Sequence, residues 1–240
     1  MAKTKRKTSA ADKAKRARAP KSSVRKKSAL SRKKTEASGK ETIKKNLGRA
    51  NLKPGALLAP LPAVMVTVGS GDEANIITIG WCGILSTDPP RAYISVRPSR
   101  HSYAKLLANR EFVINLTTES LCRHTDYAGI YTGAKVDKFS KLGLSRVESK
   151  EVNAPTIAES PLSLECRVFD IIKSGTHDIF LSDIVNVSCS CDIIDEKGRI
   201  CLDRAGLITY SHGEYFALGK KLGNFGFSAT KATKVVKEKK

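Results

Sequence analysis

Short apolar runs alternate with turn residues through the middle of the chain, a pattern typical of a β-sheet. The sequences GSGD and TDPP punctuate this region, because glycine and proline favour turns. The period changes within 99–111, where Tyr103, Leu106 and Leu107 recur at helical spacing behind a serine that can cap a helix. We therefore predict a helix there, followed by a strand at 112–116. The runs rich in β-branched residues that predict the preceding strands are 64–68, 74–80, 83–87 and 91–96.

The second half is predicted to be mainly strand. Segments 163–175 and 177–194 are joined by S-G-T, a hairpin signal, and 206–219 predicts a last strand or hairpin. Before them, 117–133 and 134–144 have a helical pattern and end at T-G and L-G-L. Many short strands with few helices predict a mainly β fold, a β-barrel with helical insertions.

Most of the net charge of +20 lies in two tails. Residues 1–45 contain 18 Lys and Arg but 3 Asp and Glu, and 229–240 contain 5 and 1. The remaining 46–228 is nearly neutral and is predicted to be one globular domain. The first tail has almost no large apolar residues, so we predict that it is disordered. It is either a solvated tail or a non-specific contact for polyanions such as nucleic acid.

Several classes of protein are disfavoured by what the sequence lacks. No run approaches the roughly 20 apolar residues of a membrane span, and the N-terminal tail has no apolar secretory core. The six cysteines include no C-x-x-C pair, so we expect reduced, buried thiols in a cytoplasmic protein rather than a metal site. No G-x-G-x-x-G precedes a helix, which argues against a separate dinucleotide-binding domain.

Cations and hydroxyls gather where the strand 91–96 meets the following helix. If that helix begins near Ser99, then Arg97, Arg100 and Ser102 cluster at its start. Free backbone N–H groups and the helix dipole favour an anion there, and arginine binds phosphate with two parallel hydrogen bonds. The alternative is an ordinary capped helix flanked by solvated arginines.

Polar residues also interrupt the apolar region upstream. Asn75, Thr78 and Ser86 lie near Trp81, which is the only tryptophan. A tryptophan on a barrel is most often part of the core. The polar groups could instead bind the edge of a heterocycle.

Five segments, taken in order, resemble the flavin reductase-like family of FMN-binding split barrels, especially its flavoredoxin-type members. The resemblance covers about residues 50–228. It implies a split β-barrel, FMN as the cofactor, and a homodimer with the flavin in a groove at the interface. It also implies redox chemistry that the flavin itself performs. The segments are NIITIGWCGILSTDPPRAYISVRPSRHSY, FVINL, TGAKVDKFSKLGL, LECRV with SGTHDIFLSDIV, and YFALGKKLGNFGFS.

The resemblance also assigns roles to individual residues. Lys138, in D-K-F, is the first candidate to stabilise the anionic reduced flavin, with a helix-surface charge as the alternative. His177 matches the histidine of the G-x-H hairpin, and Tyr210 or Phe216 supplies an aromatic residue beside the flavin. The predicted cofactor-binding set is Asn75, Thr78, Trp81, Cys82, Gly83, Ser86, Arg97, Arg100, Ser102, Lys138, His177 and Tyr210.

These observations predict an FMN-dependent oxidoreductase that either reduces flavin with NAD(P)H or carries electrons between unknown partners. Thr132-Gly133-Ala134 stands where several members of the family have S-G-R, which puts the use of pyridine nucleotide in doubt. One alternative is a basic-tailed, nucleic-acid-associated protein with a non-catalytic barrel. Another keeps the fold but replaces FMN with a deazaflavin, a heme or a pyridoxal-type ligand.

Overall fold

The computed structural model describes residues 48–229. The basic tail predicted at 1–45 lies outside the described residues, as does all but the first residue of the tail predicted at 229–240. All the helices and strands described below lie after Lys53 and belong to one compact unit.

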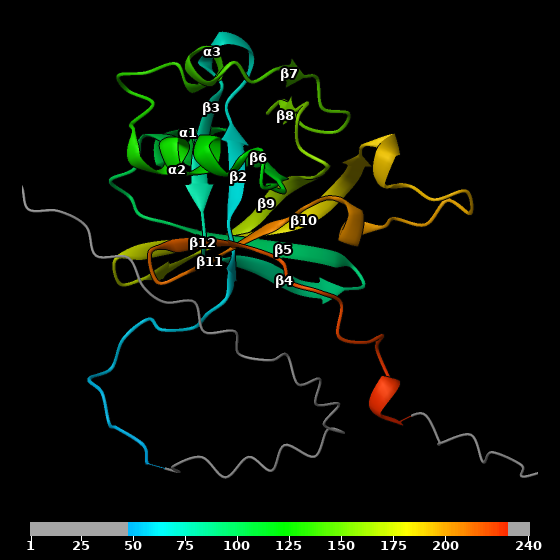
Figure 1. Cartoon of the computed structure of the whole chain (residues 1–240). Helices are drawn as coiled ribbons and strands as arrows, with labels where there is room; N and C mark the ends of the chain where they lie inside the picture. The colour runs from blue at the N-terminus through cyan, green and yellow to red at the C-terminus, as the bar shows by residue number, and fades with distance from the viewer. Residues whose placement is uncertain (1–47, 230–240) are drawn as a thin grey trace, which may run out of the picture. The chain divides into compact units, whose positions relative to one another are not determined.

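Seven antiparallel strands form the main sheet, in the order β3-β2-β6-β9-β10-β5-β4 (Figure 1). Each strand predicted for this sheet is present, so the prediction of a mainly β fold is confirmed. The longest pair, β9 and β10, forms the hairpin that S-G-T predicted, with Gly175 at a φ of 62° in its turn. The strands are β2 (Val64–Val68), β3 (Asn75–Ile79), β4 (Cys82–Thr87), β5 (Pro90–Val96), β6 (Glu111–Asn115), β9 (Leu162–Ser174) and β10 (His177–Cys189).

Two small sheets complete the strands. β1 (Leu61–Pro62) pairs with β11 (Ile208–Ser211), which in turn pairs with β12 (Glu214–Ala217), and this hairpin was predicted. β7 (Arg146–Val147) pairs with β8 (Thr156–Ile157). Strands of two residues show no sequence period, so β1, β7 and β8 could not be predicted.

The helices are shorter than their sequence patterns predicted. They are α1 (His101–Asn109), α2 (Cys122–Ile130) and α3 (Lys138–Leu142), with short 3-10 turns η1 (Gly71–Glu73), η2 (Cys191–Ile193), η3 (Leu202–Arg204) and η4 (Phe227–Ala229). The predicted serine cap of α1 is wrong. A turn closed by the Arg100 N–H on the Arg97 carbonyl delays the helix, so Arg100 is the N-cap residue. No helix within 48–229 is long and apolar enough to span a bilayer.

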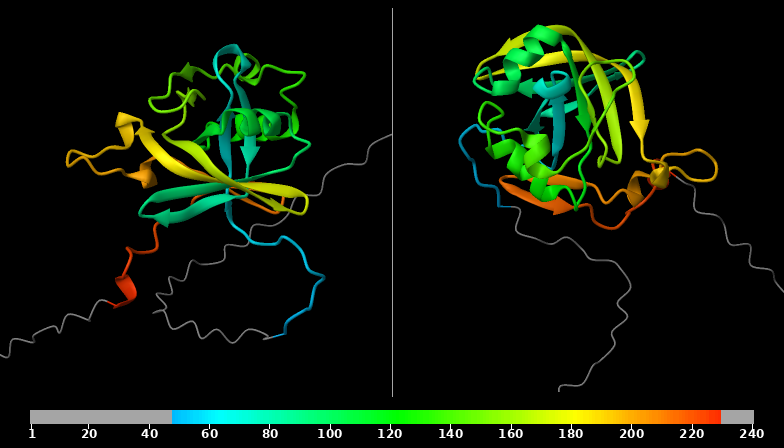
Figure 2. Two further views of the ribbon diagram at one scale, coloured as in Figure 1. Left: turned by 180° about the vertical axis from the view of Figure 1, so that it is seen from behind. Right: turned by 90° about the horizontal axis from the view of Figure 1, so that it is seen from above.

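The core forms around β2, whose five residues are all buried. One cluster joins β2 and β6 to β5 and β10 and includes Phe112 and Phe180. A second cluster packs α2 and α3 on the other side of β2 and β3 and includes Phe139. The helices therefore lie beside β2 and β3, whereas β4, β5 and β12 lie at the other end of the domain (Figures 1 and 2). The expectation that all six cysteines are buried is wrong: Cys166 is buried, Cys191 is exposed in η2, and the other four are partly exposed.

Candidate functional site

The larger of two adjoining pockets lies where β3, β5 and β10 meet the β11–β12 hairpin. Its volume is about 250 Å³. Six of the residues predicted to bind the cofactor line it: Thr78, Trp81, Arg97, Arg100, His177 and Tyr210. Segments more than 100 residues apart in sequence are thus brought to one site.

Trp81 forms an aromatic wall of this pocket together with His177. Their ring centroids are 4.6 Å apart, and Arg97 Nε lies 3.4 Å from His177 Nε2. Trp81 is 40% exposed, so the interpretation of this residue as core is wrong. It lies between β3 and β4, which are the two edge strands of the main sheet. Burial lowers the pKa of His177, and the charges of Arg97 and Arg100 add to that effect, so the imidazole is neutral at physiological pH.

A second aromatic group comes from the β11–β12 hairpin. Antiparallel pairing puts Tyr210 opposite Tyr215, with ring centroids 5.3 Å apart, and both line the larger pocket. The Tyr215 hydroxyl donates to Asp126 at 3.3 Å, and burial with this carboxylate raises the pKa of Tyr215 to about 12. Phe216, the alternative to Tyr210, is 47% exposed and is not part of the pocket wall. It alternates to the other face of β12.

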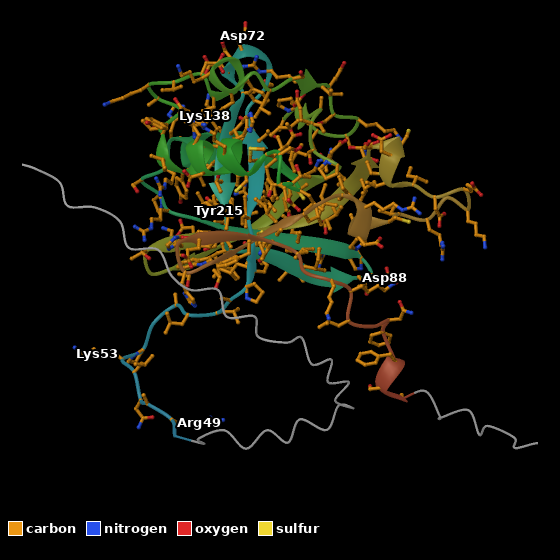
Figure 3. All side chains as sticks on the ribbon, in the orientation of Figure 1. Arg49, Lys53, Asp72, Asp88, Lys138 and Tyr215 are labelled. Atoms are coloured by element: carbon orange, nitrogen blue, oxygen red, sulfur yellow. The ribbon has the colours of Figure 1, made fainter. Side chains whose placement is uncertain are left out.

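The smaller pocket, of about 90 Å³, lies at the start of α1. It holds Asn75, Arg100, Ser102 and Lys138 from the predicted set. It also shares Ile77, Arg100 and Gly129 with the larger pocket, so the two adjoin. Figure 3 shows Lys138, which lines the smaller pocket, near the helices, and Tyr215, which lines the larger one, at the level of the β11–β12 hairpin.

Lys138 is the most deeply buried cation of the site, with 3% of its surface exposed. Its Nζ donates to the carbonyls of Ile76 and Ala128, both at 2.6 Å. No carboxylate within the described part of the chain forms an ion pair with it, and these two bonds use two of its three N–H groups. Burial, helped by the charge of Arg100, lowers its pKa to about 8. The alternative of a helix-surface charge is wrong, because Asp137 caps α3 and turns the next side chain inward.

Asn75 and Ser102 join β3 to the first turn of α1. Asn75 Nδ2 donates to Ser102 Oγ at 2.8 Å, and both side chains are buried. Because Ser102 accepts this bond, its own hydrogen can be donated elsewhere. Gly133 packs directly on the Asn75 amide, where any Cβ would collide with it. Glycine is therefore required opposite Asn75.

Four predicted residues have other surroundings. The Thr78 hydroxyl donates to the Thr125 carbonyl, so it attaches α2 to β3, although Thr78 still lines the larger pocket. Cys82 packs against the core, and burial raises the pKa of its thiol to about 12. Gly83 faces the Tyr93 ring, and Ser86 pairs with Arg91 near the β4–β5 turn. The last three lie outside both pocket walls because β4 runs away from the site.

Some residues of the walls were not predicted. Ser95, Gly129 and Tyr215 line the larger pocket, and Gly133 lines the smaller one. Two signals were available: Tyr215 lies in the same predicted hairpin as Tyr210, and Gly129 and Gly133 lie close together in the second half of the segment 117–133. Neither signal says which strand the segment will contact.

The donors and the shape of the two pockets define what can bind. The smaller pocket offers two cations, a hydroxyl and the start of a nine-residue helix, a set of groups that suits a dianionic phosphate. The larger pocket is walled by aromatic rings and apolar strand residues, which suits a flat heterocycle. The residues therefore fit a ring system joined to a phosphate by a short linker.

Comparison with known proteins identifies the family of the chain. The model of the family described as "Flavin reductase like domain" matches residues 58–219. An uncharacterised protein of Archaeoglobus fulgidus is 34% identical over 131 residues, which span 55% of this chain and 73% of that protein. "FMN reductase (NADH) RutF 2" of Rhizobium rhizogenes is 27% identical over 124 residues, or 52% of this chain and 69% of the relative.

Solved structures resemble the fold closely. Flavoredoxin of Desulfovibrio vulgaris superimposes with a TM-score of 0.71 at 27% identity, covering 76% of this chain and all of that one. A structure from Shewanella frigidimarina described as having a split barrel domain gives a TM-score of 0.62 at 18% identity, over 68% and 84% of the two chains. The predicted split-barrel fold is confirmed.

Proposed function

The chain belongs to the flavin reductase-like domain family, and from this premise we propose that it is an FMN-dependent oxidoreductase that holds its cofactor across the two adjoining pockets. The observation that carries the proposal is Lys138, a buried ammonium without a carboxylate partner in the described structure, at the wall of a pocket that also contains Arg100 and Ser102. A buried cation of this kind calls for an anion. The comparisons favour a flavin protein over a nucleic-acid-associated protein with a non-catalytic barrel.

The FMN phosphate would occupy the smaller pocket. Arg100 would bind two of its oxygens, Ser102 and the first N–H groups of α1 would donate to it, and Lys138 would supply a third cationic hydrogen bond. In this arrangement Lys138 serves the phosphate rather than the N1–C2 edge of the flavin. Its Nζ is held by Ile76 and Ala128 in the smaller pocket and does not line the larger one.

The isoalloxazine would lie in the larger pocket, beside Trp81 and Tyr210 and within reach of Arg97 and His177. Flavin supplies one- and two-electron redox chemistry when bound. The chain positions it: Trp81 and Tyr210 offer flat surfaces, and Arg97 places a positive charge at the wall. We propose that Cys82, Gly83 and Ser86 act through β4 and do not contact the ring.

The electron donor would approach the exposed side of the larger pocket. We propose NAD(P)H as a transient reductant, since a relative is named an NADH-dependent FMN reductase. Ala134 supplies no charge to a nicotinamide nucleotide. The absence of a charge at this position favours the other role, an electron carrier that takes electrons from a protein. Mixing the holoprotein with NADH or NADPH without oxygen distinguishes the two roles, because only a reductase loses its yellow colour.

We further propose a homodimer in the cytoplasm. Large apolar side chains are exposed on β4, β9 and β10, and burying them against a second copy would stabilise a pair. All six cysteines are free, as expected in a reducing compartment. Light scattering during gel filtration measures the mass. The exposed apolar residues concerned are Ile84, Leu85, Phe169, Ile172 and Val187.

Contact of the basic tail with polyanions stays a prediction, because residues 1–45 lie outside the described structure. Binding of a generic DNA duplex should fall steeply as salt rises. A chain that starts at residue 46 should lose this binding and keep its flavin.

The decisive test of the function is the cofactor itself. Purified protein should be yellow, with FMN as the flavin released on denaturation, as identified by mass spectrometry. Arg100→Ala should weaken FMN by roughly 1.5–3 kcal/mol, the typical value of a charge-assisted hydrogen bond. The exposed Arg123→Ala, on α2, is a matched control. A colourless protein that ignores added FMN, or that releases heme, deazaflavin or pyridoxal phosphate, would overturn the proposal.

A further inference from the structure

The first turn of α1 is attached to the sheet on two sides. Ser102 accepts from Asn75 of β3 at 2.8 Å. The next residue, Tyr103, reaches in another direction, and its hydroxyl donates to the Asp178 carboxylate of β10. The Tyr103 ring also meets Phe180 edge to face, with centroids 5.6 Å apart and an interplanar angle of 77°. The start of this helix therefore has a fixed distance from both strands.

Asp178 lies directly behind the wall of the larger pocket in sequence and in strand register, because its neighbours His177 and Val96 both line that pocket. It follows His177, which contacts Trp81 in the larger pocket, and it pairs across the sheet with Val96, the residue before Arg97. Only 6% of its surface is exposed. A carboxylate buried this deeply requires a donor. Within residues 48–229, Tyr103 is the side chain that hydrogen-bonds it, and no cation forms an ion pair with it.

The bond is strong enough to perturb the tyrosine. Hydrogen bonding to the Asp178 carboxylate raises the pKa of Tyr103, with smaller contributions from burial and from the charge itself. The hydroxyl therefore stays protonated and keeps donating. Neither side chain lines either pocket, so a role in direct contact with the ligand is excluded by position.

We propose that Tyr103 and Asp178 form a positioning pair that sets the separation between the phosphate pocket and the ring pocket, and so selects a ligand that carries both groups. This inference rests on the proposed binding of FMN. One wall of the phosphate pocket is the start of α1, and one wall of the ring pocket is the start of β10. The pair joins these walls directly. A ligand with two linked ends gains affinity only when both sites can be occupied at once.

The consequence is specific to the two-ended ligand. When the pair is broken, the ring pocket still accepts riboflavin, which has no phosphate. FMN loses the benefit of simultaneous contact at both ends. A pair that merely stabilised the fold would instead weaken both flavins together.

The test measures the affinities of FMN and riboflavin for wild type, four variants of the pair and one control variant. Tyr103→Phe and Asp178→Val each break the pair, and the double variant replaces both polar partners with apolar groups, which restores stability. Asp178→Asn keeps an acceptor oxygen for Tyr103 and should keep the preference for FMN. Tyr93→Phe is the control, because the Tyr93 ring faces Gly83 of β4 and lies outside both pockets.

In Tyr103→Phe, Asp178→Val and the double variant, FMN should bind about tenfold more weakly, a loss of about 1.4 kcal/mol, while riboflavin binds as in wild type. The double variant should melt close to wild type and still lack the preference. Trp81, the only tryptophan, provides a second readout, since its contact with His177 should loosen and its emission should change.

The outcomes separate this inference from the function on which it rests. Wild-type protein that binds FMN no better than riboflavin overturns the phosphate pocket itself. If wild type prefers FMN and the folded double variant keeps that preference and the same Trp81 emission, the positioning pair is wrong and the function stands. Loss of preference in Asp178→Asn equal to that in Asp178→Val would also contradict it.

Discussion

The two pockets are built in opposite ways. The smaller one is fixed by buried hydrogen bonds: Lys138 to two carbonyls, and Asn75 to Ser102. The larger one is walled by rings on the edges of the sheet, among them Trp81, which is 40% exposed. In the arrangement that we propose, the rigid smaller pocket holds the phosphate of FMN. The half-exposed rings of the larger pocket leave a side through which electrons would enter or leave the flavin.

The largest expected effect comes from removing the buried cation. Lys138→Met should weaken FMN by about 3 kcal/mol, the upper end for a charge-assisted hydrogen bond, and leave riboflavin within about twofold. Flavin fluorescence titration measures the affinities for FMN and riboflavin. Lys141→Met on the exposed face of α3 is the matched control. If riboflavin weakens as much as FMN, Lys138 faces the ring, and the contrast between the pockets disappears.

The titration of Lys138 gives the next effect. Its pKa of about 8 in the protein without ligand lies below the ordinary lysine value. A bound dianion should raise this pKa, so FMN binding takes up a proton above pH 8, and affinity should fall by up to about tenfold per pH unit there. Below pH 8 the titration of Lys138 should not change the affinity for FMN.

Isothermal titration calorimetry in buffers of different ionisation enthalpy measures how many protons are taken up when FMN binds. Lys138→Arg keeps its charge throughout the range and should bind FMN without the decline. Riboflavin should show no such decline even in wild type. A decline shared by riboflavin would place the titrating group at the ring.

The smallest effect is expected at the open side. Trp81→Ala should change the free energy of unfolding by less than about 1.5 kcal/mol, because a half-exposed ring contributes less burial than a core aromatic. Phe112→Ala, in the buried core, should cost about 3–5 kcal/mol. Urea denaturation measures the free energy of unfolding of the two variants. Equal losses would mean that Trp81 is core after all and that the larger pocket is less open than its walls indicate.

Most of the fold follows from local pattern. The β-branched runs and the turn sequences S-G-T and T-D-P-P place the long strands within a few residues, since period and turn chemistry act over short distances. Helix length was overestimated because 117–133 and 134–144 contain turns that helical spacing alone does not reveal. The start of α1 was also misplaced, since the turn at Arg97–Arg100 prevailed over the serine signal.

Part of the candidate site could also be predicted from local sequence, and part of it could not. The sequence alone marked Arg97, Arg100 and Ser102, because a strand–helix junction with cations has an anion-binding chemistry that needs no distant partner. Resemblance to a family added Lys138, His177 and Tyr210. Neither source revealed that Ser86 lies by the far turn of β4, because a strand's direction away from a pocket depends on its neighbours.

The sequence by itself predicted a nearly neutral, mainly β domain between basic tails, with a junction near residue 100 whose cations and hydroxyls suit an anion. These properties depend on composition, period and chain neighbours. Only the tertiary structure decided that Lys138 is buried at the wall of that junction, that Tyr215 joins Tyr210, and that Tyr103 meets Asp178 across 75 residues of chain. Such contacts depend on strand order and register, and these are set by the packing of the whole sheet rather than by any one segment.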